Sequence, residues 1–233
     1  MTETALKKIT NYFDLFLLNI KVKFGNFIEY MRVVSNYYSN STFAKIDSYL
    51  VFSYLFNNPF VISKRFLLSR NEPDVYTYGE TPLTSLEDIA KECRLSSKDV
   101  VFELGCGRGR TCYWLNQFIG CSVVGIDYVP EFIKRASEVK SKFGIENVQF
   151  RLEDILDSDF KGVTVIYMCG TCFSDEFILK LVKRFNTLPK GTKIISVSYP
   201  LSDYSKDNSY EIMKRFPIRF SWGLSDVYLQ VKL

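Results

Sequence analysis

The stretch Val100-Val101-Phe102-Glu103-Leu104-Gly105-Cys106-Gly107-Arg108-Gly109 decides the fold class of this chain. A short apolar run that ends in an acid predicts a buried strand, and the glycines at every second position predict a sharp turn. The helical pattern of residues 110–118 follows directly. The stretch therefore predicts a strand, a turn and a helix whose N-terminus faces a bound ligand.

The spacing of the glycines separates two kinds of nucleotide-containing cofactor. A dinucleotide-binding loop would have its third glycine at position 110, where this chain has Arg110. Here an acid, Glu103, is followed by Gly105, Gly107 and Gly109. Acid-x-Gly-x-Gly-x-Gly is the spacing of S-adenosylmethionine binders, so we expect S-adenosyl-L-methionine as the cofactor.

Two further acids follow the next two predicted strands. Asp127 ends the strand 122–126, and an acid at this place can accept hydrogen bonds from both ribose hydroxyls. Asp154 follows the strand 148–151 and can accept the adenine amino group, a role for which Glu153 competes. Because ligands of such sheets bind at the carboxyl ends of the strands, we expect these acids to share one edge with Glu103.

The remainder of the chain alternates helix and strand from residue 84 onward. This alternation predicts an α/β fold of the Rossmann-like kind, with a seven-stranded, mostly parallel sheet and helices on both faces. Residues 218–222 and 226–231, joined at Gly223, predict a closing antiparallel hairpin. Residues 76–233 thus form the main domain.

Residues 1–75 predict an N-terminal helical cap packed on that domain. Apolar residues recur at steps of three and four and trace one helical stripe: Leu6, Ile9, Phe13, Leu17, Ile20, Phe24, Ile28 and Met31. An alternative is a membrane-surface helix whose lysines face lipid headgroups: Lys7, Lys8, Lys21 and Lys23. The segment has nine Lys/Arg against six Asp/Glu, an excess too small to favour the membrane.

Composition excludes several classes of function. Histidine is absent, which removes Ser-His-Asp and Cys-His catalysis and histidine-bound zinc, and we expect no metal site. The net charge is +4 without a run of basic residues, so a nucleic-acid partner is not expected. No secretory signal is evident and no apolar run reaches the ~18–20 residues that span a bilayer, so we expect a reduced, cytoplasmic protein.

Residues 84–233 resemble class I S-adenosylmethionine-dependent methyltransferases. Within that class the chain looks closest to the non-SET histone-lysine methyltransferases of the disruptor-of-telomeric-silencing family. It is also similar to the small lysine methyltransferases that act on mitochondrial ATP synthase and translation factors. The narrower resemblance rests on Tyr78-Gly79-Glu80-Thr81, on the motif 103–109, on the strand 165–168 and on Phe173.

The resemblance implies roles for individual residues. The loop with Tyr78 and Thr81 would close over the methionine part of the cofactor, and Cys169 would lie beside the methyl donor. The family has Asn-Asn where this chain has Cys169-Gly170. Our candidates for guiding the acceptor are Tyr78, Glu80, Tyr167 and Tyr199. We expect a protein lysine as the acceptor, with a small molecule as the main alternative.

Two hypotheses of other classes remain. Cys169 and Cys172 form a Cys-x-x-Cys motif, which is typical of redox pairs. No second close pair of cysteines is present to complete a zinc site. The other hypothesis is a catalytically silent scaffold with the same fold.

Overall fold

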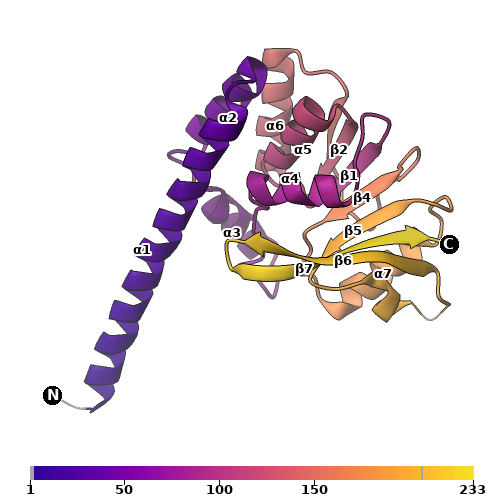
Figure 1. Ribbon diagram of the computed structural model, residues 1–233. Coiled ribbons are helices and arrows are strands. Elements are labelled where there is room, and N and C mark those ends of the chain that lie inside the picture. The colour runs from indigo at the N-terminus through magenta and orange to yellow at the C-terminus, as the bar shows by residue number, and fades with distance from the viewer. Residues whose placement is uncertain (1–2, 206) are drawn as a thin grey trace.

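The computed structural model describes residues 3–205 and 207–233, with side chains from residue 20 onward. One seven-stranded sheet has the order β3-β2-β1-β4-β5-β7-β6 (Figure 1). The first five strands are parallel, and β6 and β7 form an antiparallel hairpin beside β5. The strands are β1 (Val100–Leu104), β2 (Ser122–Asp127), β3 (Val148–Leu152), β4 (Val165–Met168), β5 (Lys193–Val197), β6 (Tyr210–Phe220) and β7 (Gly223–Lys232).

The predicted seven-stranded, mostly parallel sheet is therefore confirmed. The hairpin is longer than the sequence indicated, because β6 begins at Tyr210 instead of residue 218. Five consecutive residues of β6, 211–215, are exposed at the edge of the sheet, so the apolar alternation that would predict a strand is missing there.

Helices cover both faces of the sheet. The first three form the cap, α4–α6 cover one face, and α7 covers the other (Figure 1). They are α1 (Glu3–Tyr37), α2 (Ser41–Ser53), α3 (Pro59–Ser69), α4 (Leu83–Glu92), α5 (Arg110–Trp114), α6 (Pro130–Phe143) and α7 (Asp175–Phe185), with a π-helical turn η1 (Leu115–Ile119) and a 3-10 turn η2 (Leu201–Tyr204).

The core has two parts because successive strand residues point to opposite faces. Val101 and Val165 pack with the cap and with α4–α6. Their neighbours Phe102 and Ile166 pack with α7 on the other face. Residues of β1 and β2 are buried in both parts of the core, so the carboxyl ends of these strands are anchored where the glycine loop leaves the sheet.

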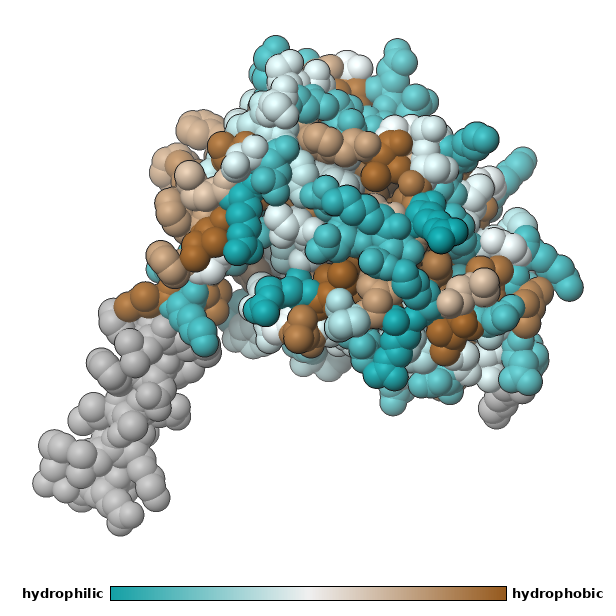
Figure 2. All heavy atoms as spheres, in the orientation of Figure 1, coloured by the Kyte–Doolittle hydropathy of each residue, from teal (hydrophilic) through white to brown (hydrophobic). Residues whose placement is uncertain are grey.

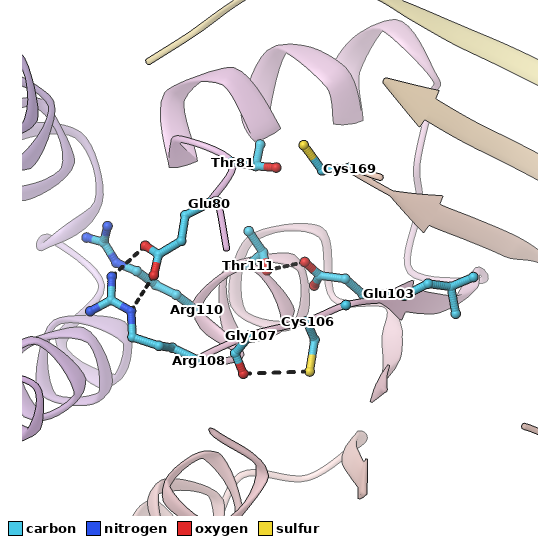
Figure 3. A pocket seen from close by; sticks show the side chains of 12 residues that line it. Glu80, Thr81, Glu103, Cys106, Gly107, Arg108, Arg110, Thr111 and Cys169 are labelled. Atoms are coloured by element: carbon cyan, nitrogen blue, oxygen red, sulfur yellow. Dashed lines mark hydrogen bonds and ion pairs between the residues drawn. The ribbon is translucent and has the colours of Figure 1, made fainter. Parts of the chain in front are cut away.

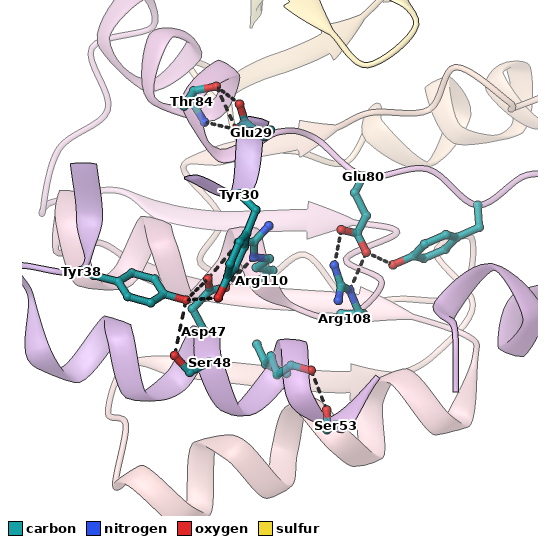
Figure 4. Close-up of polar contacts among 12 residues, drawn as sticks. Glu29, Tyr30, Tyr38, Asp47, Ser48, Ser53, Glu80, Thr84, Arg108 and Arg110 are labelled. Atoms are coloured by element: carbon teal, nitrogen blue, oxygen red, sulfur yellow. Dashed lines mark hydrogen bonds and ion pairs between the residues drawn. The ribbon is translucent and has the colours of Figure 1, made fainter. Parts of the chain in front are cut away.

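The last turns of α1 and the inner face of α2 attach the cap to the domain. Val33 and Tyr37 of α1 are buried, and the Tyr37 hydroxyl donates to Glu87 Oε2 of α4 at 2.6 Å. Glu29 of α1 accepts from the Thr84 hydroxyl at 2.9 Å and from the Thr84 backbone N–H at 3.2 Å (Figure 4). The first turn of α4 is thus satisfied by a residue of the cap.

The described part of the predicted α1 stripe is largely exposed. Ile20, Phe24 and Met31 are exposed, and Ile28 is only half-buried; residues 20–27 are exposed on every side, so this part of α1 extends beyond the domain. The stripe residues before Ile20 lie outside the described side chains. Periodicity establishes that a helix has an apolar side, and the partner of that side depends on how the helix is placed. The cap boundary at residue 75 stays a prediction.

Candidate functional site

A cavity lies beside the glycine loop at the carboxyl end of β1 (Figure 3). It is lined by residues 79–81, 103–108 and 110–111 and by Cys169. Three segments that are distant in the sequence, namely the Tyr78–Thr81 loop, the β1–α5 loop and the end of β4, therefore meet there. The cavity volume is about 40 Å³, which suffices for a few water molecules.

The backbone of the glycine loop is turned toward the protein. Gly105 N and Cys106 N both donate to Ile126 O, Gly107 N donates to Asp127 and Gly109 N donates to Cys106 O. Four of the five amides from Gly105 to Gly109 are thus engaged, and they do not form the anion-binding nest of a dinucleotide site. Gly105 has φ +78°, and the space where a Cβ would stand is open, so a ligand can approach the backbone there.

Asp127 ties the loop to the end of β2. Its Oδ2 accepts from Gly107 N at 2.8 Å and its Oδ1 accepts from Val129 N at 2.9 Å. Burial raises the pKa of Asp127, and these backbone hydrogen bonds lower it in part. Asp127 is buried next to the cavity and does not line it. Its role as a ribose acceptor stays a prediction, which the unused lone pairs of both oxygens would allow.

Glu103 is a buried acid that lines the cavity. Its carboxylate accepts from the Thr111 hydroxyl and from the Cys112 thiol, the latter at 3.0 Å. Burial raises the pKa of Glu103 to about 7, and the nearby carboxylates of Asp127 and Glu80 act in the same direction. This carboxyl group is therefore poised to become ionised when a cation binds beside it.

Arg108 of the loop and Arg110, the first residue of α5, form ion pairs that the sequence did not predict (Figure 4). Arg108 binds Glu80 through two hydrogen bonds, from Nε at 2.6 Å and from Nη2 at 2.5 Å. Arg110 binds the fully buried Asp47 of α2 in the same bidentate way. Both arginines line the cavity, and Asp47 of the cap holds one of them, Arg110, from behind without lining the cavity itself. Arg108 holds the pKa of Glu80 below its usual value, and Glu80 is ionised at neutral pH.

The Tyr78–Thr81 loop packs directly over the glycine loop. The Tyr78 ring lies 3.1 Å from the place where a Cβ on Gly107 would stand, and its hydroxyl donates to Glu80. Phe60 of α3 meets the same ring edge to face, with centroids 5.0 Å apart. This contact places the loop beside the glycine loop, and its closing over the methionine part of the cofactor stays a prediction. Tyr78 lies outside the cavity lining, whereas Glu80 and Thr81 belong to it.

The candidate tyrosines differ in their placement. Tyr167 is 2% exposed, and its hydroxyl is bonded to the Thr81 hydroxyl at 2.5 Å, so it lies behind the cavity and anchors the loop. Tyr199 lies beyond Cys169, where its hydroxyl donates to Gly170 O at 3.2 Å. Burial raises the pKa of Tyr78, Tyr167 and Tyr199 well above the ordinary value. These hydroxyls stay protonated at neutral pH and do not serve as general bases.

The segment after β4 is enclosed by aromatic rings. A Cβ on Gly170 would meet the Phe173 ring at 2.3 Å and the Tyr199 hydroxyl at 2.7 Å, so only glycine fits there. Cys169 lines the cavity, and the Cys172 thiol donates to Thr77 O at 3.1 Å. Burial raises the pKa of Cys169 to about 12 and also raises that of Cys172. These two thiols are therefore rarely ionised at neutral pH. Because the thiolate is the reactive form, this argues against the redox hypothesis.

The two acids after β3 are placed differently. Asp154 is exposed, and its Oδ1 accepts from Leu156 N at 2.8 Å within its own turn. Glu153 has one side-chain oxygen that is buried and has no hydrogen-bond partner in the part of the chain that the structure describes. A buried acceptor without a donor fits an incoming amino group. Among these two, the contacts favour Glu153 over the predicted Asp154.

Comparison with known proteins gives the following matches. Residues 95–214 match the family described as "Methyltransferase domain". A histone-lysine N-methyltransferase of Dictyostelium discoideum, specific for lysine 79 of H3, is 25% identical over 183 residues, which are 70% of this chain and 10% of that protein. A sterol 24-C-methyltransferase of Eremothecium gossypii is 23% identical over 145 residues, 60% of this chain and 39% of that protein.

Solved structures show the same fold. An RNA methyltransferase from Salinibacter ruber, solved with S-adenosyl-L-homocysteine, superimposes with a TM-score of 0.55 at 20% identity, covering 66% of this chain and 94% of that chain. At this identity the likeness concerns the fold alone. This chain spans about a tenth of the length of the Dictyostelium protein and about two fifths of that of the sterol enzyme.

Proposed function

We propose, from the premise that this chain belongs to the methyltransferase domain family, that it transfers a methyl group from S-adenosylmethionine to a lysine amine of a protein. S-adenosylmethionine is the cofactor, and its sulfonium already makes the methyl group electrophilic. The residues of this chain therefore have to bind and align the two reactants and to exclude water.

The residues around the cavity suit the parts of this cofactor. Glu103 would face the ammonium of the amino-acid end, and Arg108 or Arg110 would meet its carboxylate. The open side of Gly105 admits the ligand close to the backbone. The unpartnered oxygen of Glu153 would accept the adenine amino group. Most amides of the glycine loop already donate hydrogen bonds within the protein, so they are not available to a pyrophosphate. This supports a cofactor that lacks one.

One observation carries the choice of a lysine acceptor: the segment after β4 is walled by neutral aromatic side chains. Phe173 and Tyr199 enclose Gly170, next to Cys169 of the cavity. A free lysine has a pKa of ~10.4 and has to lose its proton before it attacks. An aromatic surround disfavours the charged amine and so promotes that loss. The Dictyostelium relative, named for a histone lysine, supports the same acceptor.

Cofactor binding should depend on pH through Glu103. Its pKa of about 7 is raised, so in the free protein the group is protonated below pH 7. A bound ammonium favours the ionised form, and binding below this pH therefore releases a proton. We expect the affinity for S-adenosylmethionine to fall by up to about tenfold per pH unit below about 7. Calorimetry in buffers of different ionisation enthalpy measures the released proton.

The matched control is Glu103→Gln, which cannot ionise. It should bind more weakly at pH 8 and lose this pH dependence. A wild-type affinity that stays constant between pH 5.5 and 8 would refute the assignment of Glu103 to the ammonium.

The lysine acceptor is tested with Tyr199. The purified protein is incubated with labelled S-adenosylmethionine and host-cell extract, and the digested proteins are examined by mass spectrometry. We expect lysines heavier by one CH₂ unit. Tyr199→Ala opens the aromatic wall and should lower lysine transfer at least about tenfold, or about 1.4 kcal/mol in the barrier, while Tyr199→Phe keeps the ring and most of the activity.

Three outcomes contradict parts of this proposal. Label in a metabolite or in RNA, with none on protein lysine, rejects the lysine acceptor and keeps the methyltransferase. Cofactor binding without transfer to any fraction favours the catalytically silent scaffold. Thiol–disulfide exchange by Cys169 and Cys172, without cofactor binding, would support the redox hypothesis.

A further inference from the structure

Where α1 extends beyond the domain, one side of the helix carries a row of large, exposed apolar side chains. Ile20, Phe24, Phe27 and Met31 follow one another at steps of four, three and four, which places them on one face of the helix. They are 48%, 64%, 58% and 50% exposed. We call these four residues the outer face of α1. Figure 2 shows brown side chains at the place where α1 leaves the domain.

The charges beside the outer face have one sign. In residues 20–37 the cations are Lys21, Lys23 and Arg32, and all three are exposed. The one acid of this stretch, Glu29, lies on the opposite side and binds Thr84 of α4. The outer face is therefore an apolar row flanked by cations. The one acid of the stretch, Glu29, is bound to the domain and does not offset these charges.

We propose that the outer face of α1 binds the surface of an anionic lipid bilayer. A helix with an apolar face flanked by lysine and arginine lies in the bilayer interface, where the apolar side chains enter the acyl boundary and the cations meet lipid phosphates. Two copies of this stretch would place cations against cations, which disfavours pairing of the outer face with a second chain.

The connection between α2 and α3 adds a second apolar feature to the cap. Leu55 and Phe56 are 63% and 87% exposed on a short non-helical segment. A helix face and a loop tip that are both apolar suit a lipid surface better than the narrow seam of a helix pair. Among the described residues no helix is long and apolar enough to cross a membrane, and the proposal requires only binding at the surface.

The test is sedimentation of the full chain with vesicles. One set contains phosphatidylcholine with about 30% phosphatidylserine, and the other contains phosphatidylcholine alone. We expect binding to the anionic vesicles that weakens as salt is raised. The double variant Phe24→Glu with Phe27→Glu should bind more than about 100-fold less tightly, and Lys21→Gln with Lys23→Gln about 30-fold less.

The matched control is Leu179→Glu on α7, since Leu179 is also exposed and α7 covers the other face of the sheet. It should bind vesicles as the wild type does, and all variants should unfold at the same temperature because these side chains are exposed. Equal binding to both kinds of vesicle overturns the proposal. So does a dimer in solution that the two glutamates abolish, with no vesicle binding by the wild type, since the outer face would then pair two copies.

Discussion

Replacing Asp47 with alanine should lower the free energy of unfolding by about 3–5 kcal/mol, because it leaves a largely buried arginine, whose side chain is 16% exposed, without its counter-ion. Asp47 is fully buried on α2 and receives two hydrogen bonds from Arg110, at 2.5 and 2.8 Å. It also accepts from the Tyr38 hydroxyl at 3.0 Å. The variant would therefore leave the Arg110 guanidinium without its counter-ion and remove one acceptor from the Tyr38 hydroxyl, which keeps its contacts with Tyr30 and Ser48.

Urea unfolding at equilibrium measures this loss, and a second variant identifies its cause. Asp47→Ala combined with Arg110→Met removes both charges, so most of the lost free energy should return. If the single variant lost less than about 1 kcal/mol, water would reach Arg110 freely, and the ion pair would contribute as little as a surface pair does. The cap would then be joined to the domain mainly by apolar packing.

Gly109→Ala should destabilise the chain by about 2–5 kcal/mol. Gly109 has φ +71°, and a Cβ there would stand 2.5 Å from the Phe150 ring of β3 and 3.3 Å from Ala136 of α6. A left-handed conformation costs about 1–2 kcal/mol for a residue with a side chain, and overpacking adds about 1–3 kcal/mol. For a chain of this size the melting temperature should fall by roughly 5–15 °C.

Gly105→Ala is the matched control for this prediction. Gly105 has a similar φ of +78°, but nothing lies within 4 Å of the place for its Cβ. It should cost only the backbone strain of about 1–2 kcal/mol, while its methyl group enters the cavity and weakens cofactor binding. Equal stability losses in the two variants would show that φ alone matters and that contact with Phe150 does not. Thermal unfolding and cofactor titration of both variants decide between these results.

Much of the fold could be predicted from the sequence because its signals are local. The strand at Val100–Leu104 is an apolar run that ends at a turn, and the glycine spacing after it needs no knowledge of distant residues. Pro130 at the start of α6 and Gly144 at its end set that helix within a few residues. Glu103 and the Tyr78–Thr81 loop were predicted as parts of one site, and both contribute to the lining of the cavity.

The ion pairs of the site could not be predicted in this way. Asp47 and Arg110 are 63 residues apart, and Glu80 and Arg108 are 28 apart. Neither spacing corresponds to a helix or strand period, so only the folded chain shows that they meet. The sequence did contain one signal, namely two arginines at the end of a glycine-rich segment. Arginines that are removed from water need counter-ions, so acidic partners could be expected without being identified. Asp47 carried no signal of its own, and Glu80 was singled out for the motif at 78–81 and not as a partner of Arg108.

By itself the sequence determined the elements, their order and the chemistry of the glycine loop, since hydrophobic period and turn residues act over a few positions. Tertiary structure alone decided which side of each element meets which neighbour. It left the described part of the α1 stripe exposed and placed Tyr167 behind the cavity instead of in it. The reason is that an amphipathic pattern specifies a face to be covered, whereas the covering partner depends on contacts between residues far apart in the chain.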